Sequence, residues 1–379
     1  MKNAIIETSK NRFAFIDNVR SLVIILVVAM HSAVTYSGFG GWYYIEGSPE
    51  KLNIPETVFF GFFQSFIQAW AMGILFFISA YLAAKSVSKR GSSNFIRERL
   101  FRLGLPLIIY TFIIAPFIQF VLLNRFIDSN IYLNYFHFLL NFGHLTGPLW
   151  YVQTLLVFCI LYILQKRLFP HKKVVNNITP QNILFIILLT GTTAFFIRLV
   201  FPIGTSFSNL QFCYFASYIV LFIFGIIVGE NNLLDNISQK ANIIWLKLSL
   251  IIGTPIWCLL MVFGGAIEGK MYINGGFNWQ SITFALWESF IAIGFSIGLI
   301  ALFKEKLNIN NKFTGLLAEN AFGIYVFHSP ILIFITLLLR NWVTYATIKF
   351  FIVTIIASIA CLLFSIIIRK IKPFKIIFK

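Results

Sequence analysis

Charged side chains are scarce in this sequence, and acidic ones are the scarcest. Only 11% of its 379 residues are charged, and just 13 are Asp or Glu, whereas a soluble globular protein carries about 25% charged residues. Hydrophobic residues make up 59%, and the mean hydropathy is +0.85. They form runs of about 20 residues, the length of a helix that crosses roughly 30 Å of hydrocarbon. This composition excludes a soluble enzyme and predicts an all-α polytopic membrane protein.

Cysteine is sparse as well, and nothing in its spacing points to a disulfide or a metal. All four cysteines lie in apolar runs without a CxxC pair, which predicts buried small side chains: Cys159, Cys213, Cys258 and Cys361. His137 and His144 are seven residues apart without a nearby acid, so we expect no metal site.

The chain has no polar linker that would separate two domains. The N-terminal segment also lacks the layout of a cleaved signal peptide, so we expect the first helix to remain in the protein. We therefore expect one transmembrane domain over 1–379, with a membrane bundle over 14–369 and a basic cytoplasmic tail over 370–379.

The apolar runs predict about ten transmembrane helices. Their approximate limits are 14–37, 58–84, 103–123, 148–165, 181–201, 211–229, 243–264, 280–303, 317–339 and 346–369. A cytoplasmic loop is expected over 85–102, and the segment 124–147, rich in Phe, Leu and Tyr, is a candidate interfacial helix.

Basic residues are distributed unevenly between the two sides of these spans. With the N-terminus in the cytoplasm, 23 of the 30 Lys and Arg residues fall in cytoplasmic segments. Only Lys51, Arg125, Lys270 and Arg340 fall on the opposite side. This bias follows the positive-inside rule and predicts that both termini are cytoplasmic. It also accounts for the net charge of +17 without a nucleic-acid partner.

The first predicted span carries four polar side chains on one face. Arg20 and His31 are eleven residues apart, which at about 100° per residue brings both side chains to one face of a helix. Asp17 lies three residues before Arg20, and Thr35 four after His31. A rise of about 1.5 Å per residue puts Arg20 and His31 about 16 Å apart. Ionisable residues inside spans are usually functional. The structural alternatives are a snorkelling Arg20 paired with Asp17 and an imidazole bonded to a backbone carbonyl.

The first span contains Asp-x-x-Arg followed by ten residues and a His. This pattern resembles the acyltransferase-3 family of integral membrane O-acyltransferases. Four further segments resemble that family in the same order: FFISAYLAAKS (76–86), FIRERLFRLGLPL (95–107), GPLWYVQTLLVF (147–158) and FGIYVFHSPILI (322–333). Ala80 stands where the family usually has Gly and is still small enough for close helix packing. Residues 16–44 are also similar to the branch that includes periplasmic-glucan modifying members.

The resemblance implies an enzyme of the inner or plasma membrane that transfers an acyl group, acetyl or succinyl, from cytoplasmic acyl-CoA. The acceptor would be a hydroxyl of an extracytoplasmic carbohydrate, and no cofactor would be bound permanently. The donor would be bound by arginines, whose guanidinium groups suit phosphate: Arg20, Arg97, Arg99 and Arg102. His31 would be the general base, with an acyl-histidine intermediate as the alternative. Asp17 would orient Arg20.

Other intramembrane polar residues allow two interpretations each. Glu288 could orient the imidazole or bind a sugar hydroxyl, or it could be a structural carboxyl. His328, two residues before Pro330, is a candidate acceptor-binding residue, or it bonds a carbonyl that the proline frees. Arg198 is expected to be an interface anchor, with binding of a succinyl carboxylate or an anionic sugar as the alternative.

Aromatic residues predict the acceptor side of the site. Trp150 and Tyr151, with Gln153 next to them, are expected to bind the acceptor, because aromatic rings stack on sugars; the alternative is an aromatic belt at the membrane interface. Two other classes of protein remain open. A transporter or flippase would show broken helices and repeated halves, which the sequence does not display. A scaffold protein would bind no CoA and tolerate loss of Arg20.

Overall fold

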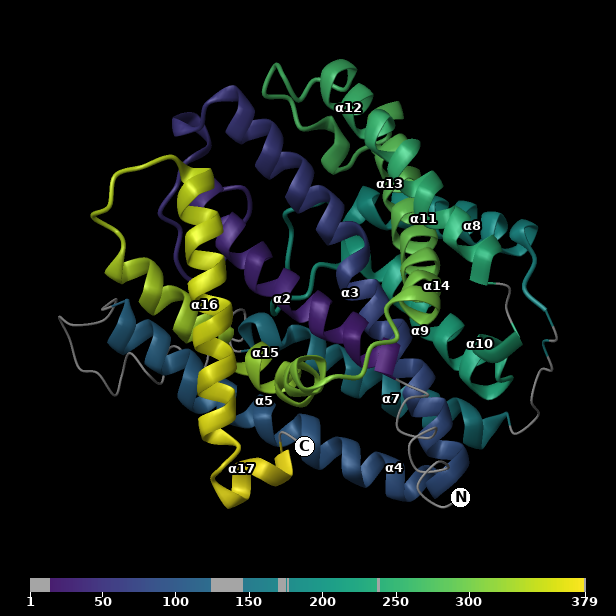
Figure 1. Cartoon of the computed structure of the whole chain (residues 1–379). Helices are drawn as coiled ribbons and strands as arrows, with labels where there is room; N and C mark the ends of the chain where they lie inside the picture. The colour runs from purple at the N-terminus through teal and green to yellow at the C-terminus, as the bar shows by residue number, and fades with distance from the viewer. Residues whose placement is uncertain (1–13, 124–145, 170–174, 176, 237–238, 378–379) are drawn as a thin grey trace.

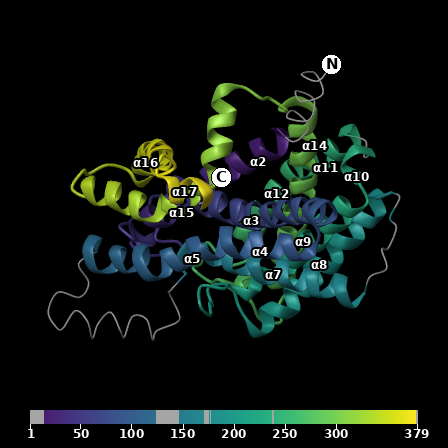
Figure 2. The same ribbon diagram turned by 90° about the horizontal axis from the view of Figure 1, so that it is seen from below.

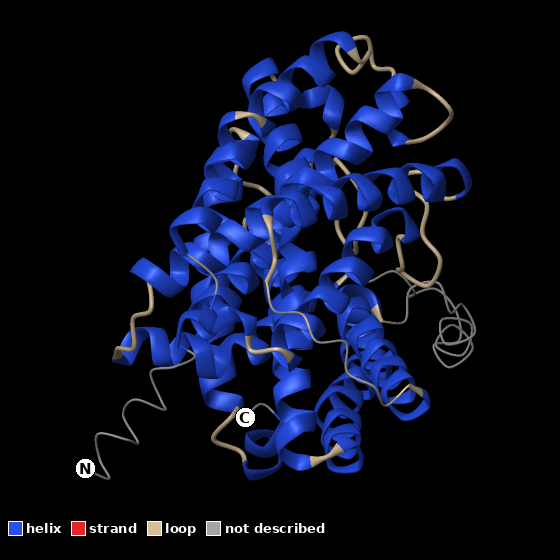
Figure 3. Cartoon of the chain, turned by 90° about the vertical axis from the view of Figure 1, so that its right-hand side faces the viewer, coloured by secondary structure: helices blue, strands red, loops and turns tan. Residues whose placement is uncertain are grey.

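The computed structural model describes residues 14–123, 146–169, 175, 177–236 and 239–377 (Figure 1). The described residues form helices joined by loops, without a strand beyond an isolated bridge between Phe207 and Leu210 (Figure 3). They contain ten helical segments long and apolar enough to cross a membrane. The prediction of an all-α polytopic membrane protein is therefore confirmed.

The spanning segments are formed by single helices or by short helices joined end to end. Their bounds are α2 Ala14–Ser37, α3 Ile54–Arg90, α4 Ser92–Arg99, α5 Leu105–Ile109, α7 Trp150–Leu168, α8 Pro180–Val200, α9 Phe215–Glu230, α10 Leu233–Asn236, α11 Gln239–Ile251, α12 Gly253–Phe263, α13 Trp279–Phe290, α14 Ser296–Lys306, α15 Lys312–Leu338, α16 Ala346–Ile368 and α17 Lys372–Ile377. Turns of π-helix over Leu100–Gly104, Tyr110–Ile114 and Phe117–Leu122 continue α4 and α5 into one span.

The expected loop over 85–102 is helical instead, so that expectation is wrong. A capping box between Asn53 and Glu56 begins α3, and the helix continues to Arg90 because Lys and Arg are good helix formers. It stops at Gly91, whose φ of +82° suits glycine, and α4 starts at the next residue. The candidate interfacial helix over 124–147, with His137 and His144, lies almost entirely outside the described residues.

Helices α2 and α3 occupy the middle of the bundle. In Figure 1, α2 runs across the centre beside α3, with α16 on one side and α11 and α14 on the other. Figure 2 shows α15 and α16 at one end of the molecule and α8 and α10 at the other. Within the spanning window of α3, 83% of the residues are buried, against 22% in α16. Side chains on α2 and α3 are thus surrounded by protein, whereas most of α16 faces outward.

Small residues bring α3 and α9 into backbone contact. A Cβ atom on Gly225 would lie 2.3 Å from the carbonyl oxygen of Phe77 and 2.8 Å from the Cβ of Ala80. One turn further, Gly229 faces Ala84 in the same way. Gly225 and Gly229 form the G-x-x-x-G spacing typical of close helix pairs in membranes. The small side chain at Ala80 has the packing role that its position suggested.

Candidate active site

Two rings lie against the predicted catalytic residue, one from the loop that follows its helix and one from near the other end of the chain. The His31 ring of α2 stacks on the Trp42 ring, with 4.5 Å between centroids and 17° between planes. It also stacks on the His328 ring of α15 at 5.1 Å and 25°. The Trp42 and His328 centroids are 6.4 Å apart. Trp42 belongs to the segment between α2 and α3, so one loop and two helices build this ring cluster.

Hydrogen bonds fix the orientation of the outer two rings. The Trp42 Nε1–H lies 2.9 Å from Thr35 Oγ1 and 2.7 Å from the carbonyl oxygen of Tyr44. His328 Nδ1 lies 2.6 Å from the carbonyl oxygen of Tyr325. Because a carbonyl oxygen only accepts, Nδ1 of His328 must carry the hydrogen, and Nε2 of the neutral ring keeps its lone pair.

The carbonyl that His328 binds differs from the one that Pro330 frees. A proline leaves the carbonyl four residues before it without an intrahelical donor, which here is that of Val326. His328 instead bonds the carbonyl of Tyr325, one residue earlier. The imidazole therefore does bond a backbone carbonyl, but compensation for the proline does not explain its placement.

Two imidazole nitrogens in this cluster have no partner among the described residues. They are Nδ1 of His31 and Nε2 of His328, and both atoms are buried. His328 is fully buried, whereas His31 is half-buried. Buried polar atoms are almost always hydrogen-bonded in folded proteins. Unpartnered imidazole nitrogens are therefore available for chemistry with a bound substrate.

A tyrosine pair continues the cluster inward from His328. The Tyr325 ring lies 5.8 Å from the His328 ring and 6.1 Å from the Tyr151 ring, between centroids. Tyr325 donates its hydroxyl hydrogen to the carbonyl of Pro148. Tyr151 donates to the carbonyl of Leu75, 3.0 Å away.

The position of Tyr151 differs from that of an interface aromatic. Only 8% of it is exposed, and its hydroxyl is also 2.9 Å from Ser79 Oγ. Arg20 and Arg99 both interact electrostatically with this hydroxyl. Tyr151 thus lies between the histidines and the arginines, inside the bundle.

Three of the four arginines predicted to bind the donor are near one another. Arg20 Nη1 bonds Asp17 Oδ1 at 2.9 Å, as the spacing of three residues predicted. The Arg99 guanidinium lies 5.3 Å from the Phe95 ring centroid and interacts electrostatically with Arg20 and Arg102. Three guanidinium groups in one place attract a polyanion.

Arg20 and Arg102 are partly neutralised by carboxylates. Arg97, the fourth predicted arginine, lies elsewhere on its helix. Arg102 bonds Glu98 at 3.3 Å, just as Arg20 bonds Asp17. Arg97 is exposed on α4, and no contact described here joins it to the other three.

Glu288 belongs to a different cluster from His31. It forms an ion pair with Arg198, and the two side chains are 5% and 0% exposed. The Arg198 guanidinium lies 5.7 Å from the Tyr214 ring centroid and 5.6 Å from that of Phe284. The structure gives Glu288 a partner other than His31. The expectation that Arg198 is an interface anchor is wrong, because its whole side chain is buried.

The remaining predicted acceptor residues lie beside Tyr151 on α7. The Trp150 ring stacks on the Tyr218 ring of α9 at 5.6 Å. The side-chain oxygen of Gln153 is buried and has no partner within the described part of the chain. Tyr325 precedes His328 by one helical turn, so this spacing could have identified it in the sequence as a residue of the site. Trp42 could be recognised only by depth, because a loop places it.

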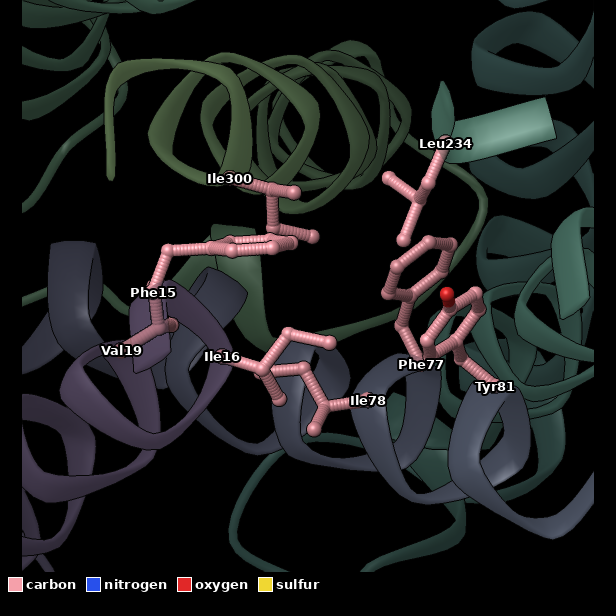
Figure 4. Close-up of a pocket in the computed structure, with 8 residues that line it drawn as sticks. All are labelled: Phe15, Ile16, Val19, Phe77, Ile78, Tyr81, Leu234 and Ile300. Atoms are coloured by element: carbon pink, nitrogen blue, oxygen red, sulfur yellow. The ribbon is translucent and has the colours of Figure 1, made fainter. Parts of the chain in front are cut away.

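The apolar pocket in Figure 4 lies on another side of α2. It is lined by Phe15, Ile16, Val19, Phe77, Ile78, Tyr81, Leu234 and Ile300. Asp17, Arg20 and His31 are not among the residues that line this pocket. Within the residues the structure describes, no group of three His, Cys, Asp or Glu side chains could hold a metal ion.

Comparison with known proteins gives one match, at the level of the family. No curated protein and no solved structure matches the chain. A family model described as an acyltransferase domain matches residues 13–370, nearly the whole chain. The match includes the stretch with Asp17, Arg20 and His31, and the segment that carries His328. The chain therefore belongs to the acyltransferase-3 family and is an integral, multi-pass membrane acyltransferase.

Proposed function

We propose that the protein transfers an acyl group, acetyl or succinyl, from cytoplasmic acyl-CoA to a hydroxyl of a carbohydrate on the other side of the membrane. The observation that carries this proposal is the series of side chains from Arg20 and Arg99 through Tyr151 and Tyr325 to the histidines. It joins a cationic site at one end of α2 to a pair of imidazoles about 16 Å further along the helix.

The cationic end suits the donor. Coenzyme A carries several phosphates, and guanidinium groups bind phosphate with paired, charge-assisted hydrogen bonds. With both termini in the cytoplasm, as the distribution of basic residues predicts, Arg20 lies near the cytoplasmic end of α2. Asp17 holds the Arg20 guanidinium through a single hydrogen bond, which leaves other N–H groups of this side chain for a ligand.

The histidine end suits the transfer step. A nitrogen of His31 takes the proton of the acceptor hydroxyl as the oxygen attacks the thioester carbonyl carbon. A carbon–oxygen bond forms, the carbon–sulfur bond breaks, and the departing thiolate takes the proton from the imidazolium. CoA leaves as the thiol and the carbohydrate as its ester, so atoms and charge balance. General base catalysis of this kind contributes about 10²–10⁴ in rate.

Mass spectrometry of envelope glycans from cells with and without the gene tests this function. We expect glycans from cells that carry the gene to contain an added acyl mass that is lost on deletion. Return of the wild-type gene should restore it, and return of His31→Gln should not. An unchanged glycan profile after deletion would refute glycan acylation.

The His31→Gln variant tests the catalytic role separately. It should be present in the membrane at the wild-type level and elute as a folded protein in gel filtration. If this folded variant restored acylation fully, the role of His31 as base would be wrong while the acyltransferase function stood.

A further inference from the structure

Among the residues that the structure describes, Trp42 is the closest aromatic neighbour of the proposed base, although it lies outside the spans. Its ring faces the His31 ring at 4.5 Å and is nearly parallel to it. The His328 ring stacks on His31 as well, at 5.1 Å. His31 is therefore in contact with two aromatic faces at once.

The loop that carries Trp42 is fixed to the end of α2. The backbone N–H groups of Glu46 and Gly47 both donate to the carbonyl of Thr35 at 2.9 Å. Gly47 allows this approach because a Cβ there would lie 1.8 Å from the Tyr36 carbonyl oxygen. Glu46 also forms an ion pair with Lys349 of α16. The Trp42 ring is thus positioned before any substrate binds.

A protonated His31 has little other stabilisation in this cluster. Its Nδ1 is buried and has no acceptor among the described residues. The titratable group that faces it from α15 is His328, which brings no negative charge. Burial raises the pKa of the neighbouring Tyr43 hydroxyl to about 12, so that this group stays neutral. The face of a Trp ring attracts a cation within about 6 Å, and Trp is the best of the aromatic residues at this.

We propose that Trp42 is a positioning residue that stabilises the imidazolium form of His31 during acyl transfer. This inference rests on the proposed function, in which His31 becomes positively charged as it takes the hydroxyl proton. The charge develops in the transition state, so the contact with Trp42 strengthens there and should act on kcat more than on KM. A Trp that only packed against His31 would not depend on the electron density of its ring, and a Trp that only bound the acceptor would act on KM for the acceptor instead of on kcat.

Stepwise fluorination of the ring separates these roles, because fluorine withdraws electron density from the ring face with little change of shape. Mono-, di-, tri- and tetrafluorotryptophan are incorporated at position 42 of the full-length protein in nanodiscs. CoA release is measured with acetyl-CoA and with succinyl-CoA as donors. The acceptor is a mixture of envelope oligosaccharides from cells that lack the gene. Tetrafluorotryptophan at Trp279, a half-exposed residue, is the matched control.

We expect kcat to fall at each step, by about 5- to 30-fold over the series, with KM nearly unchanged. Trp42→Leu should lower kcat to the end of this range, and the kcat of Trp42→Phe should lie between those of wild type and Trp42→Leu. The Trp279 control should have the kcat of wild type. An active wild type with a flat kcat across the series would overturn the proposal, as would a rise in KM alone. A wild type that transfers no acyl group would overturn the proposed function as well, so the two failures are distinguishable.

Discussion

Replacing Gly225 by alanine should force α9 away from α3 and lower both stability and activity. The new Cβ would lie 2.3 Å from the Phe77 carbonyl oxygen, whereas ordinary contacts of a Cβ begin at 3.4 Å. The nearest atoms are the Phe77 carbonyl group and the Cβ of Ala80, which cannot rotate away as the end of a long side chain can. The two helices must therefore separate by about an ångström.

The size of the effect follows from two opposing terms. Overpacking costs about 1–3 kcal/mol, and contact with backbone puts this site at the upper end. Alanine gains about 1 kcal/mol over glycine in a helix. A net loss of about 2 kcal/mol should lower the apparent melting temperature in detergent by roughly 4 °C. Acyl transfer should fall too, because α3 also carries Ser79, which contacts the Tyr151 hydroxyl.

Gly315→Ala is the matched control for this measurement. Gly315 lies in the first turn of α15, and a Cβ there would meet no atom within 4 Å. The same substitution should leave the melting temperature equal to that of wild type or raise it slightly. If Gly225→Ala melted at or above the wild-type temperature, as we expect of Gly315→Ala, the close contact between α3 and α9 would be refuted.

Variants at three further sites test the charged and hydrogen-bonded groups. Arg198→Met should cost about 3–5 kcal/mol by leaving Glu288 buried without its partner, and a second change, Glu288→Leu, should recover most of that loss in a double-mutant cycle of thermal unfolding. Arg20→Lys should raise KM for acyl-CoA about tenfold because the planar guanidinium is lost, and Asp17→Asn should raise this KM less. Initial rates measured against donor concentration give the KM of each variant. A KM unchanged in both variants would contradict the donor site. Tyr151→Phe should cost about 0.5–1.5 kcal/mol by removing the hydrogen bonds that its buried hydroxyl makes to the Leu75 carbonyl and to Ser79. An unchanged melting temperature would contradict those bonds.

The spans could be predicted from the sequence because lipid imposes a length and a composition on each one. Ten runs of apolar residues correspond to ten helical segments. The pair of Asp17 and Arg20 was also predictable, because residues three apart share a helix face. The error over 85–102 has a local cause. Basic residues suggest a cytoplasmic loop but are also good helix formers, and the single Gly91 interrupts the helix for one residue only.

The site was predictable only where it lies on one helix. The shared face of Arg20 and His31 follows from periodicity within α2. The contact between His31 and His328 joins residues at opposite ends of the chain, and no periodicity predicts it. Glu288 has a depth similar to that of His31 in the sequence, yet its partner is Arg198. Depth along the membrane normal can be read from a sequence, whereas position within the membrane plane depends on how the helices pack.

The side chains between the arginines and the histidines bear on how the acyl group crosses this distance under the proposed function. Stepwise transfer would need a nucleophile at each stage. The Tyr151 and Tyr325 hydroxyls both donate to backbone carbonyls, and a buried phenol held in this way is a poor nucleophile. The first nitrogens with an unused lone pair are those of the histidines. Under the proposed function we therefore expect the flexible arm of CoA to pass beside Tyr151 and Tyr325 and to carry the thioester to His31, where the acceptor hydroxyl meets it.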